Sequence, residues 1–295
     1  MKDLLESVLR GLGTGSIYAL LALGFVIIYK ATRVISFAQP AFMLAGAVMV
    51  TYFSKPLGFF AALALAALLT GGVALGVERL AVRPMVGRPV FTVAIITLGI
   101  DIAVRAVVNA FIGLDVRQVG DPWGLKTLKL PGGIIVEQRH IAMFVTTGIL
   151  IAGLFAFFRY TRMGLAMRAA SFDQEAALAQ GVSVGAVFAL SWALAGALAA
   201  VAGAFAGVGS SVSESLWLIA LTALPVIILG GLDSLPGAVV GGLIVGIVQE
   251  VSATYQTRFE WLGGNFSIVT PYVVMLVVLL VRPYGLFGTR EVERV

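Results

Sequence analysis

Residues 186–208 read AVFALSWALAGALAAVAGAFAGV, a run of 23 residues in which no side chain carries a charge. A helix needs about 20 predominantly apolar residues to cross the roughly 30 Å hydrocarbon core of a bilayer. This run therefore predicts a membrane-spanning helix. Similar apolar segments occur on both sides of it. Together they predict an all-α, polytopic integral membrane protein with about eight or nine membrane segments, including discontinuous or re-entrant helices. The apolar segments are 12–29, 38–53, 57–77, 90–112, 141–158, 186–208, 216–229, 235–251 and 267–282.

The composition supports one transmembrane domain that covers residues 1–295. Hydrophobic residues make up 60% of the chain and charged residues 12%, whereas soluble globular proteins average about 25% charged residues. There is no cysteine and a single histidine, His140, which excludes disulfides, thiolate nucleophiles and Cys/His metal sites. We therefore expect no cofactor on this chain. The net charge of +5 comes from Lys and Arg placed between apolar segments, a pattern typical of cytoplasmic loops rather than of nucleic-acid binding.

The positions of Lys and Arg predict the orientation. They concentrate in the loops 78–89 and 159–175 and after the first and last apolar segments. If these regions face the cytoplasm, the N-terminus lies outside and the C-terminus inside, which nine crossings satisfy. The loop 113–140 then faces outside, and short apolar runs around Pro131-Gly132-Gly133 predict a small hairpin in it. Such an ordered loop could dock a solute-carrying protein or serve as a plain connector.

The predicted cytoplasmic loop, about 159–185, contains a short helix. Asp173 and Glu175 stand near its start, where acidic side chains suit the helix dipole, and Gly181 is placed to end it. Basic residues, among them Arg168, precede it. The helix could contact another subunit or lie at the membrane surface as an ordinary interfacial helix.

Two interrupted segments predict a pathway. Ser36-Phe37-Ala38-Gln39-Pro40 and Gly230-Gly231-Leu232-Asp233-Ser234-Leu235-Pro236 each precede a stretch rich in small residues. The helix from Pro40 to Phe53 would be about 21 Å long, so we expect it to begin inside the membrane. Broken segments in the two halves of a transporter point to its substrate path, although tight turns and close packing without a substrate role would give the same pattern.

A third group of polar residues lies within the apolar segment 90–112. Asp101 and Arg105 are four residues apart and share a helix face, which Asn109 extends by a turn. An ionisable residue at this depth is a functional candidate. The alternative is an internal ion pair that holds helices together.

Together these motifs resemble the permease subunits of branched-chain amino-acid ABC importers of the LivH type, over almost the whole chain. Ser36 and Gln39 depart from the family, which usually has Asn-Phe-Ala-His there. The resemblance is carried by Gly11-x-x-x-Gly15-Ser16-x-Tyr18-Ala19-Leu20, Ser36-Phe37-Ala38, Glu78-Arg79-Leu80-Ala81-x-Arg83-Pro84, Thr97-Leu98-Gly99, the loop Arg168 to Gly181, Leu229-Gly230-Gly231-x-x-Ser234-x-Pro236-Gly237-Ala238-x-x-Gly241-Gly242 and Arg282-Pro283-x-Gly285-Leu286-Phe287-Gly288.

The resemblance implies a non-enzymatic transport subunit in the inner membrane. It implies three kinds of partner besides membrane lipid: two ATP-binding subunits, a second permease subunit of the LivM type, and an extracytoplasmic solute-binding protein. No G-x-x-x-x-G-K-[ST] phosphate loop occurs in the chain, so ATP and Mg²⁺ are expected on the partner chains. The ATPase-coupling residues would be Arg168, Asp173, Glu175, Ala176, Ala177 and Gly181. The translocation path would include Ser36, Phe37, Gln39, Pro40, Asp101, Arg105, Asn109, Gly230, Gly231, Ser234 and Pro236.

Three other functions remain open from sequence alone. An ion-coupled secondary transporter would use Asp101 as its coupling carboxylate and would need no ATPase. An intramembrane enzyme lacks a convincing catalytic pair, because the chain has no cysteine and one histidine. A structural scaffold does not explain the interrupted helices. The cargo could be a branched-chain amino acid, another amino acid, urea or a small organic acid.

Overall fold

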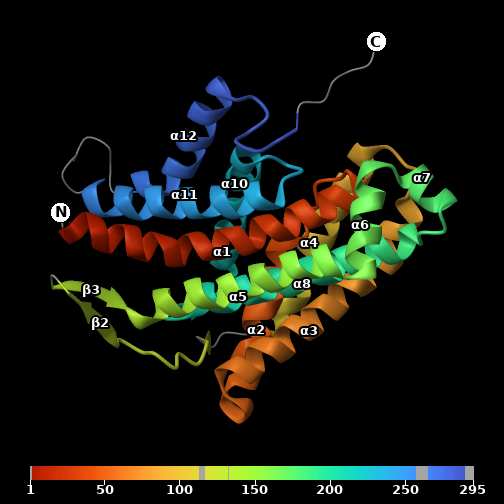
Figure 1. Ribbon diagram of the computed structural model, residues 1–295. Coiled ribbons are helices and arrows are strands. Elements are labelled where there is room, and N and C mark those ends of the chain that lie inside the picture. The colour runs from red at the N-terminus through yellow and green to blue at the C-terminus, as the bar shows by residue number, and fades with distance from the viewer. Residues whose placement is uncertain (1, 113–116, 132, 257–264, 290–295) are drawn as a thin grey trace.

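The computed structural model describes residues 2–112, 117–131, 133–256 and 265–289. The described chain is almost entirely helical, with two short pairs of strands (Figure 1). The helices are α1 (Lys2–Thr32), α2 (Gln39–Leu57), α3 (Phe59–Val77), α4 (Val90–Ile112), α5 (Gln138–Tyr160), α6 (Arg162–Phe172), α7 (Gln174–Ala179), α8 (Val184–Gly207), α9 (Trp217–Leu221), α10 (Ala223–Gly230), α11 (Leu235–Tyr255) and α12 (Phe266–Val281). The strands are β1 (Arg117–Gln118), β2 (Thr127–Leu130), β3 (Ile134–Glu137) and β4 (Ser211–Val212).

The nine apolar segments expected from the sequence are largely helical, which confirms the all-α, polytopic fold. The segment 216–229 is divided between α9 and α10. The number of segments that cross the membrane stays a prediction, because two of the apolar helices are short: Glu214–Gly230 and Phe266–Val281. Within the described ranges, six helices are long and apolar enough to cross a membrane: Lys2–Thr32, Phe59–Met85, Val90–Phe111, Gln138–Tyr160, Val184–Gly207 and Leu235–Tyr255. The helix α2, which covers nearly all of the expected segment 38–53, is not among them.

The core of the bundle is built around α1, which packs against α8 and α11. Residues 19–23 of α1 are fully buried. Trp192 of α8 is also buried, and its ring meets Phe42 of α2 edge-on at 6.2 Å between centroids. α1 begins ten residues before the apolar segment 12–29, because its first turns pack against other parts of the protein. Glu6, for example, accepts a hydrogen bond from the backbone of Ile135 in β3.

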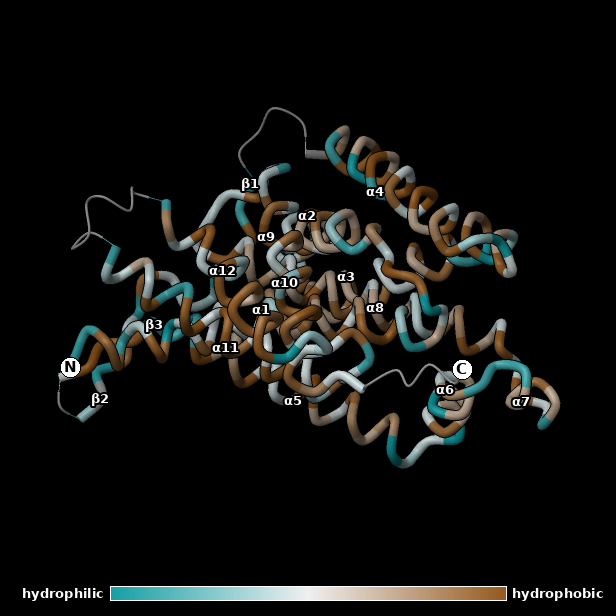
Figure 2. The backbone as a smooth tube through the Cα atoms, turned by 90° about the horizontal axis from the view of Figure 1, so that it is seen from above, coloured by the Kyte–Doolittle hydropathy of each residue, from teal (hydrophilic) through white to brown (hydrophobic). Residues whose placement is uncertain are grey.

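The bundle has two distinct ends. At one end β2 and β3 form the expected hairpin, with Leu128 opposite Val136, beside the first turns of α1. At the other end, the last turn of α1 meets α6 and the start of α11, through Arg33 and Lys30. The 31 residues of α1 separate the two ends by about 46 Å. Figure 2 shows hydrophilic residues around the N-terminus and β2 and again around α6 and α7, with hydrophobic helices between them.

The described chain starts at the hairpin end and finishes at the α6 end. Near its C-terminal limit, the backbone of Thr289 donates to Asp233, whose own carbonyl accepts from Lys30 at the end of α1. An odd number of passes between the two ends is consistent with this placement. The assignment of one end to the outside stays a prediction.

Close packing of α1 on α11 depends on glycine and provides a test of the fold. A Cβ at Gly246 would lie 2.3 Å from the backbone of Gly15, far inside van der Waals contact. We expect Gly246→Ala to lower the free energy of unfolding by about 1–3 kcal/mol, because the helices must move apart. Gly153→Ala on α5 is the control, since nothing lies within 4 Å of its Cβ. Equal thermal unfolding of both variants in detergent would show that the α1–α11 contact is looser than described.

Candidate functional site

α6 and α7 form a compact unit at the end opposite the hairpin. Thr161 caps α6 by accepting from the Gly164 amide at 2.9 Å, and Asp173 caps α7 by accepting from the Ala176 amide at 3.0 Å. Gly181 follows α7 with φ of +82°, a conformation that favours glycine. The short helix predicted between Asp173 and Gly181 is therefore present and ends where the sequence indicated, and the structure adds the cap by Asp173.

The outer surface of α7 is open for contact with another molecule. Glu175 and Ala176 are exposed, whereas Ala177 is buried against the rest of the protein. Arg168, on α6, is also exposed. The predicted coupling residues thus lie on one protruding unit, at the right of Figure 1.

Two hydrogen bonds connect this unit to the end of α1. The guanidinium of Arg33 donates to the Ser171 carbonyl at 2.9 Å, and the side chain of Gln174 donates to the Ala31 carbonyl at 2.8 Å. Arg33 has φ of +58° and is the single non-glycine residue with positive φ in the described ranges. A movement of α6 and α7 would therefore pull directly on the point where α1 ends.

The first interrupted segment follows immediately. The chain leaves α1 and re-enters helix at Gln39, with Pro40 in the first turn as predicted. Ser36 is fully buried and accepts from the Ala38 amide, and the Phe37 amide donates to Thr97 of α4 at 3.0 Å. The break between α1 and α2 is thus bound to α4 through Phe37 and Thr97. It directly follows Arg33, which binds α6.

Gln39 is the most unusual residue of this break. Its side chain is fully buried, and neither its Nε2 nor its Oε1 has a hydrogen-bond partner among the described residues. Gly24 of α1 lies against the amide: a Cβ at Gly24 would be 2.7 Å from Nε2. A buried amide without partners is costly, which makes Gln39 a candidate to bind water or a passing solute.

A substitution at Gln39 separates these roles. We expect Gln39→Leu to keep or raise the thermal stability, because an unpaired buried amide is removed, and to lower transport if solute or water passes here. Gln249→Leu is the matched control, because Gln249 already accepts from Tyr18 at 2.6 Å and its loss should destabilise the protein by about 1 kcal/mol. A marked loss of stability in Gln39→Leu would mean that the amide has a partner.

The second interrupted segment lies between α10 and α11. Gly231 has φ of +105°, and Ser234 caps α11 by accepting from the Gly237 amide at 3.0 Å, with Pro236 in the first turn. Gly230 packs against the backbone of Gly237, where a Cβ would lie 2.3 Å from the carbonyl oxygen. The segment 286–287 pairs with this break through Leu286 N to Leu229 O and Phe287 N to Gly230 O, at 2.8 and 3.1 Å.

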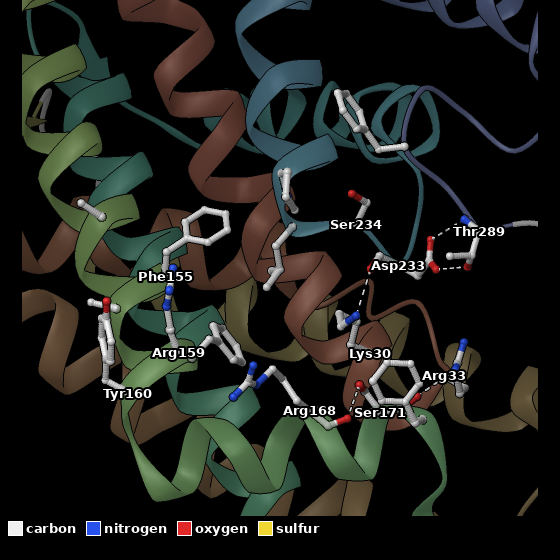
Figure 3. Close-up of a pocket in the computed structure, with 17 residues that line it drawn as sticks. Lys30, Arg33, Phe155, Arg159, Tyr160, Arg168, Ser171, Asp233, Ser234 and Thr289 are labelled. Carbon is white, nitrogen blue, oxygen red and sulfur yellow. Dashed lines mark hydrogen bonds between the residues drawn. The ribbon is translucent and has the colours of Figure 1, made fainter.

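A cavity of about 1070 Å³ opens where these parts meet (Figure 3). Its walls come from the ends of α1 and α5, from α6, and from the start of α11. It brings together Arg168 of the predicted coupling group with Ser234 and Pro236 of the predicted path. Its polar residues also include Lys30, Arg33, Arg159 and Asp233, to which the sequence pattern gave no site role.

Asp101 and Arg105 occupy a different place. Arg105 contacts the Asp101 carboxylate at 2.7 Å and Glu214 at 3.5 Å, and its guanidinium lies 5.1 Å from the centre of the Trp217 ring. The backbone amide of Ala41, in the first turn of α2, also interacts with Asp101. The ion pair on one helix face is confirmed. Asn109 is half-buried on the same helix.

The predicted path residues therefore do not share one cavity in this chain. Gln39 is enclosed between α1, α2 and α8, Ser234 and Pro236 line the large cavity, and Asp101 and Arg105 join α4 to the turn before α9. Glu214 was missed by the sequence interpretation. Its signal is a single acidic residue directly before the apolar segment 216–229.

Comparisons with a family model and with known proteins all point to the same family. The sequence model of the family described as "Branched-chain amino acid transport system / permease component" matches residues 7–281. The permease protein BraD of a high-affinity branched-chain amino acid transport system of Pseudomonas aeruginosa is 29% identical, over 99% of this chain and 98% of its own. The corresponding LivH protein of Escherichia coli is 29% identical, over 99% and 97%.

A more distant relative and a solved structure agree. A probable LivH permease protein of Methanocaldococcus jannaschii is 29% identical, over 98% of this chain and 94% of its own. A chain in the structure of PsaBC from Streptococcus pneumoniae in complex with Fab superimposes with a TM-score of 0.53, over 96% of this chain and 93% of its own. At 13% identity this likeness concerns the fold alone.

Proposed function

Because the chain belongs to the family of permease components of branched-chain amino acid transport systems, we propose that it forms part of the membrane path for branched-chain amino acids or a related small polar or amphipathic solute. It is a multi-pass transport subunit of an ATP-binding-cassette importer, not an enzyme. In this proposal two ATP-binding subunits hold ATP and Mg²⁺, a second permease subunit of the LivM type completes the path, and an external binding protein delivers the solute.

The observation that carries the coupling proposal is the attachment of α6 and α7 to the end of α1. The hydrogen bonds from Gln174 to Ala31 and from Arg33 to Ser171 measure 2.8 and 2.9 Å. A partner ATPase that presses on the exposed side of α7 would move the C-terminal end of α1 through these bonds.

The same movement would reach the break between α1 and α2. Ser36 and Gln39 follow α1 within seven residues of Thr32 and are both buried. A shift of Gln39 would change the position of its unpaired side-chain amide. The affinity of this site for a solute would then differ between the two conformations of the transporter. Such a difference in affinity is the only way in which a solute can bias the equilibrium between two conformations.

The proposed orientation in the membrane rests on the positions of Lys and Arg. The end that carries α6 and α7 also holds Lys30, Arg33, Arg159, Arg162 and Arg168, and Lys/Arg-rich ends usually face the cytoplasm. We therefore place α7 and the C-terminus in the cytoplasm and the N-terminus outside. The β2–β3 hairpin would then face the external binding protein.

The structure offers little to the ion-coupled alternative. The Asp101 carboxylate contacts Arg105 at 2.7 Å, and Arg105 in turn contacts Glu214. A coupling carboxylate must bind and release an ion, whereas Oδ2 of this one is held by Arg105 of the same helix. We assign the pair an anchoring role between α4 and the segment before α9.

Co-purification tests the importer proposal. The protein would be expressed together with its neighbouring genes, purified in mild detergent and analysed by mass spectrometry. Stoichiometric P-loop ATPase subunits are the expected result, and ATP-driven uptake of leucine into proteoliposomes, with valine, isoleucine and urea as competitors, would then define the cargo. A homogeneous, active protein without any ATPase would refute the proposal.

A further inference from the structure

The large cavity at the α6 end is strongly basic. Four cationic side chains line it, from three separate helices or helix ends: Lys30, Arg33, Arg159 and Arg168. Asp233 is its single lining carboxylate among the described residues. Figure 3 shows Arg159 and Arg168 from one side of the space and Lys30 and Arg33 from another.

The four cations have no carboxylate partner in an ion pair among the residues that the structure describes. Lys30 donates to the backbone carbonyl of Asp233 at 3.1 Å, and Arg33 to that of Ser171 at 2.9 Å. The Asp233 carboxylate accepts from the backbone and hydroxyl of Thr289. Within the described ranges, neither Arg159 nor Arg168 forms an ion pair. Among the residues that the structure describes, the lining of the cavity therefore carries a net positive charge, which a bound anion would balance.

An exposed apolar stripe leads into the cavity along α5. Val145 and Ile149 have exposed fractions of 51% and 67%. Ala152 and Ala156 continue the same face at a spacing of three or four residues, and both line the cavity. The stripe ends at Arg159, three residues after Ala156 and on the same side of α5. An apolar track that ends in a cluster of cations matches a ligand with a long apolar part and an anionic head.

We propose that this cavity binds the phosphate headgroup of an anionic phospholipid, with an acyl chain along the exposed stripe of α5. Basic pockets between transmembrane helices are suited to anionic headgroups. A free phosphate would contact the same cations but would leave the stripe uncovered. The bound lipid would link α1, α5 and α6 through its phosphate. The proposal does not depend on the solute or on the ATPase partners.

Native mass spectrometry of the purified, intact protein tests this site. The protein would be exchanged into micelles with equal amounts of phosphatidylglycerol and phosphatidylcholine of identical acyl chains. We expect at least tenfold preferential retention of phosphatidylglycerol. The double variant Arg159→Gln, Arg168→Gln should lose this preference, whereas Arg159→Lys, Arg168→Lys should keep most of it. Arg79→Gln, Arg162→Gln removes two exposed arginines that do not line the cavity and should behave as wild type.

Two further measurements separate the possible sources of the anion. Inorganic phosphate alone should not raise the thermal stability, whereas phosphatidylglycerol should. Ile149→Ser should weaken phosphatidylglycerol retention without unfolding the protein, as checked by circular dichroism. The proposal is overturned if both lipids are retained equally, if the double glutamine variant retains phosphatidylglycerol normally, or if inorganic phosphate stabilises as much as the lipid. Loss of retention when a second permease subunit co-purifies would assign the stripe to that subunit and would also overturn it.

Discussion

Replacing Glu175 by arginine is expected to reduce ATP-driven uptake about tenfold or more, while the protein still inserts and folds. Glu175 is exposed in the first turn of α7, so its side chain is not needed for packing. If this surface becomes buried against the ATPase, arginine reverses the charge and adds bulk at the contact. Loss of one partner of a buried charge pair at an interface costs about 2–5 kcal/mol. Uptake into proteoliposomes that contain the complete complex would measure the effect.

The matched control for this variant is Arg88→Glu. Arg88 is also exposed, in the connection between α3 and α4, and it lies outside α6 and α7. It should leave uptake within about twofold of wild type, since a surface charge away from a contact has little effect. Normal uptake by Glu175→Arg, or an equal loss in both variants, would contradict a specific role of α7.

Replacing Asp101 by leucine is expected to destabilise the protein by about 3–5 kcal/mol, because it leaves Arg105 without its closest partner. The two side chains are 8% and 17% exposed and contact at 2.7 Å. Asp101→Asn keeps the shape but loses the charge and should be affected less. The amount of folded protein in the membrane and its thermal unfolding in detergent would report the loss.

A double substitution distinguishes an anchoring pair from a transport residue. Asp101→Leu combined with Arg105→Met removes both charges and should recover most of the stability, because apolar replacements of a buried pair are often tolerated. If the pair only anchors α4, the double variant should also recover uptake. A stable double variant without uptake would instead place Asp101 in the transport path, as the sequence interpretation first suggested.

Much of the fold could be predicted from local sequence because the membrane imposes simple rules. Each crossing needs an apolar run, and the nine runs in the sequence are largely helical. Turn chemistry is also local, so the hairpin around Pro131 and the end of α7 at Gly181 could be predicted. The pairing of Asp101 with Arg105 follows from their spacing on one helix.

The connections between distant segments could not be predicted in this way. Arg33 and Ser171 are 138 residues apart, and Gln174 lies 143 residues from Ala31. Nothing in either local sequence specifies the partner. The same holds for Gln39: the sequence indicates an interrupted helix, whereas the complete burial of its amide depends on how α1, α2 and α8 pack.

Cross-linking from α7 tests the central proposal most directly, and the absence of native cysteine makes it simple. Glu175→Cys and Lys126→Cys place single thiols at exposed positions of α7 and of the hairpin end. The complete complex would be treated with a short thiol-to-amine cross-linker, and the products identified by mass spectrometry. We predict that Glu175→Cys forms a cross-link to the P-loop ATPase and that Lys126→Cys does not. A cross-link to the ATPase from Lys126→Cys, with none from Glu175→Cys, would contradict both the coupling role of α7 and the proposed orientation.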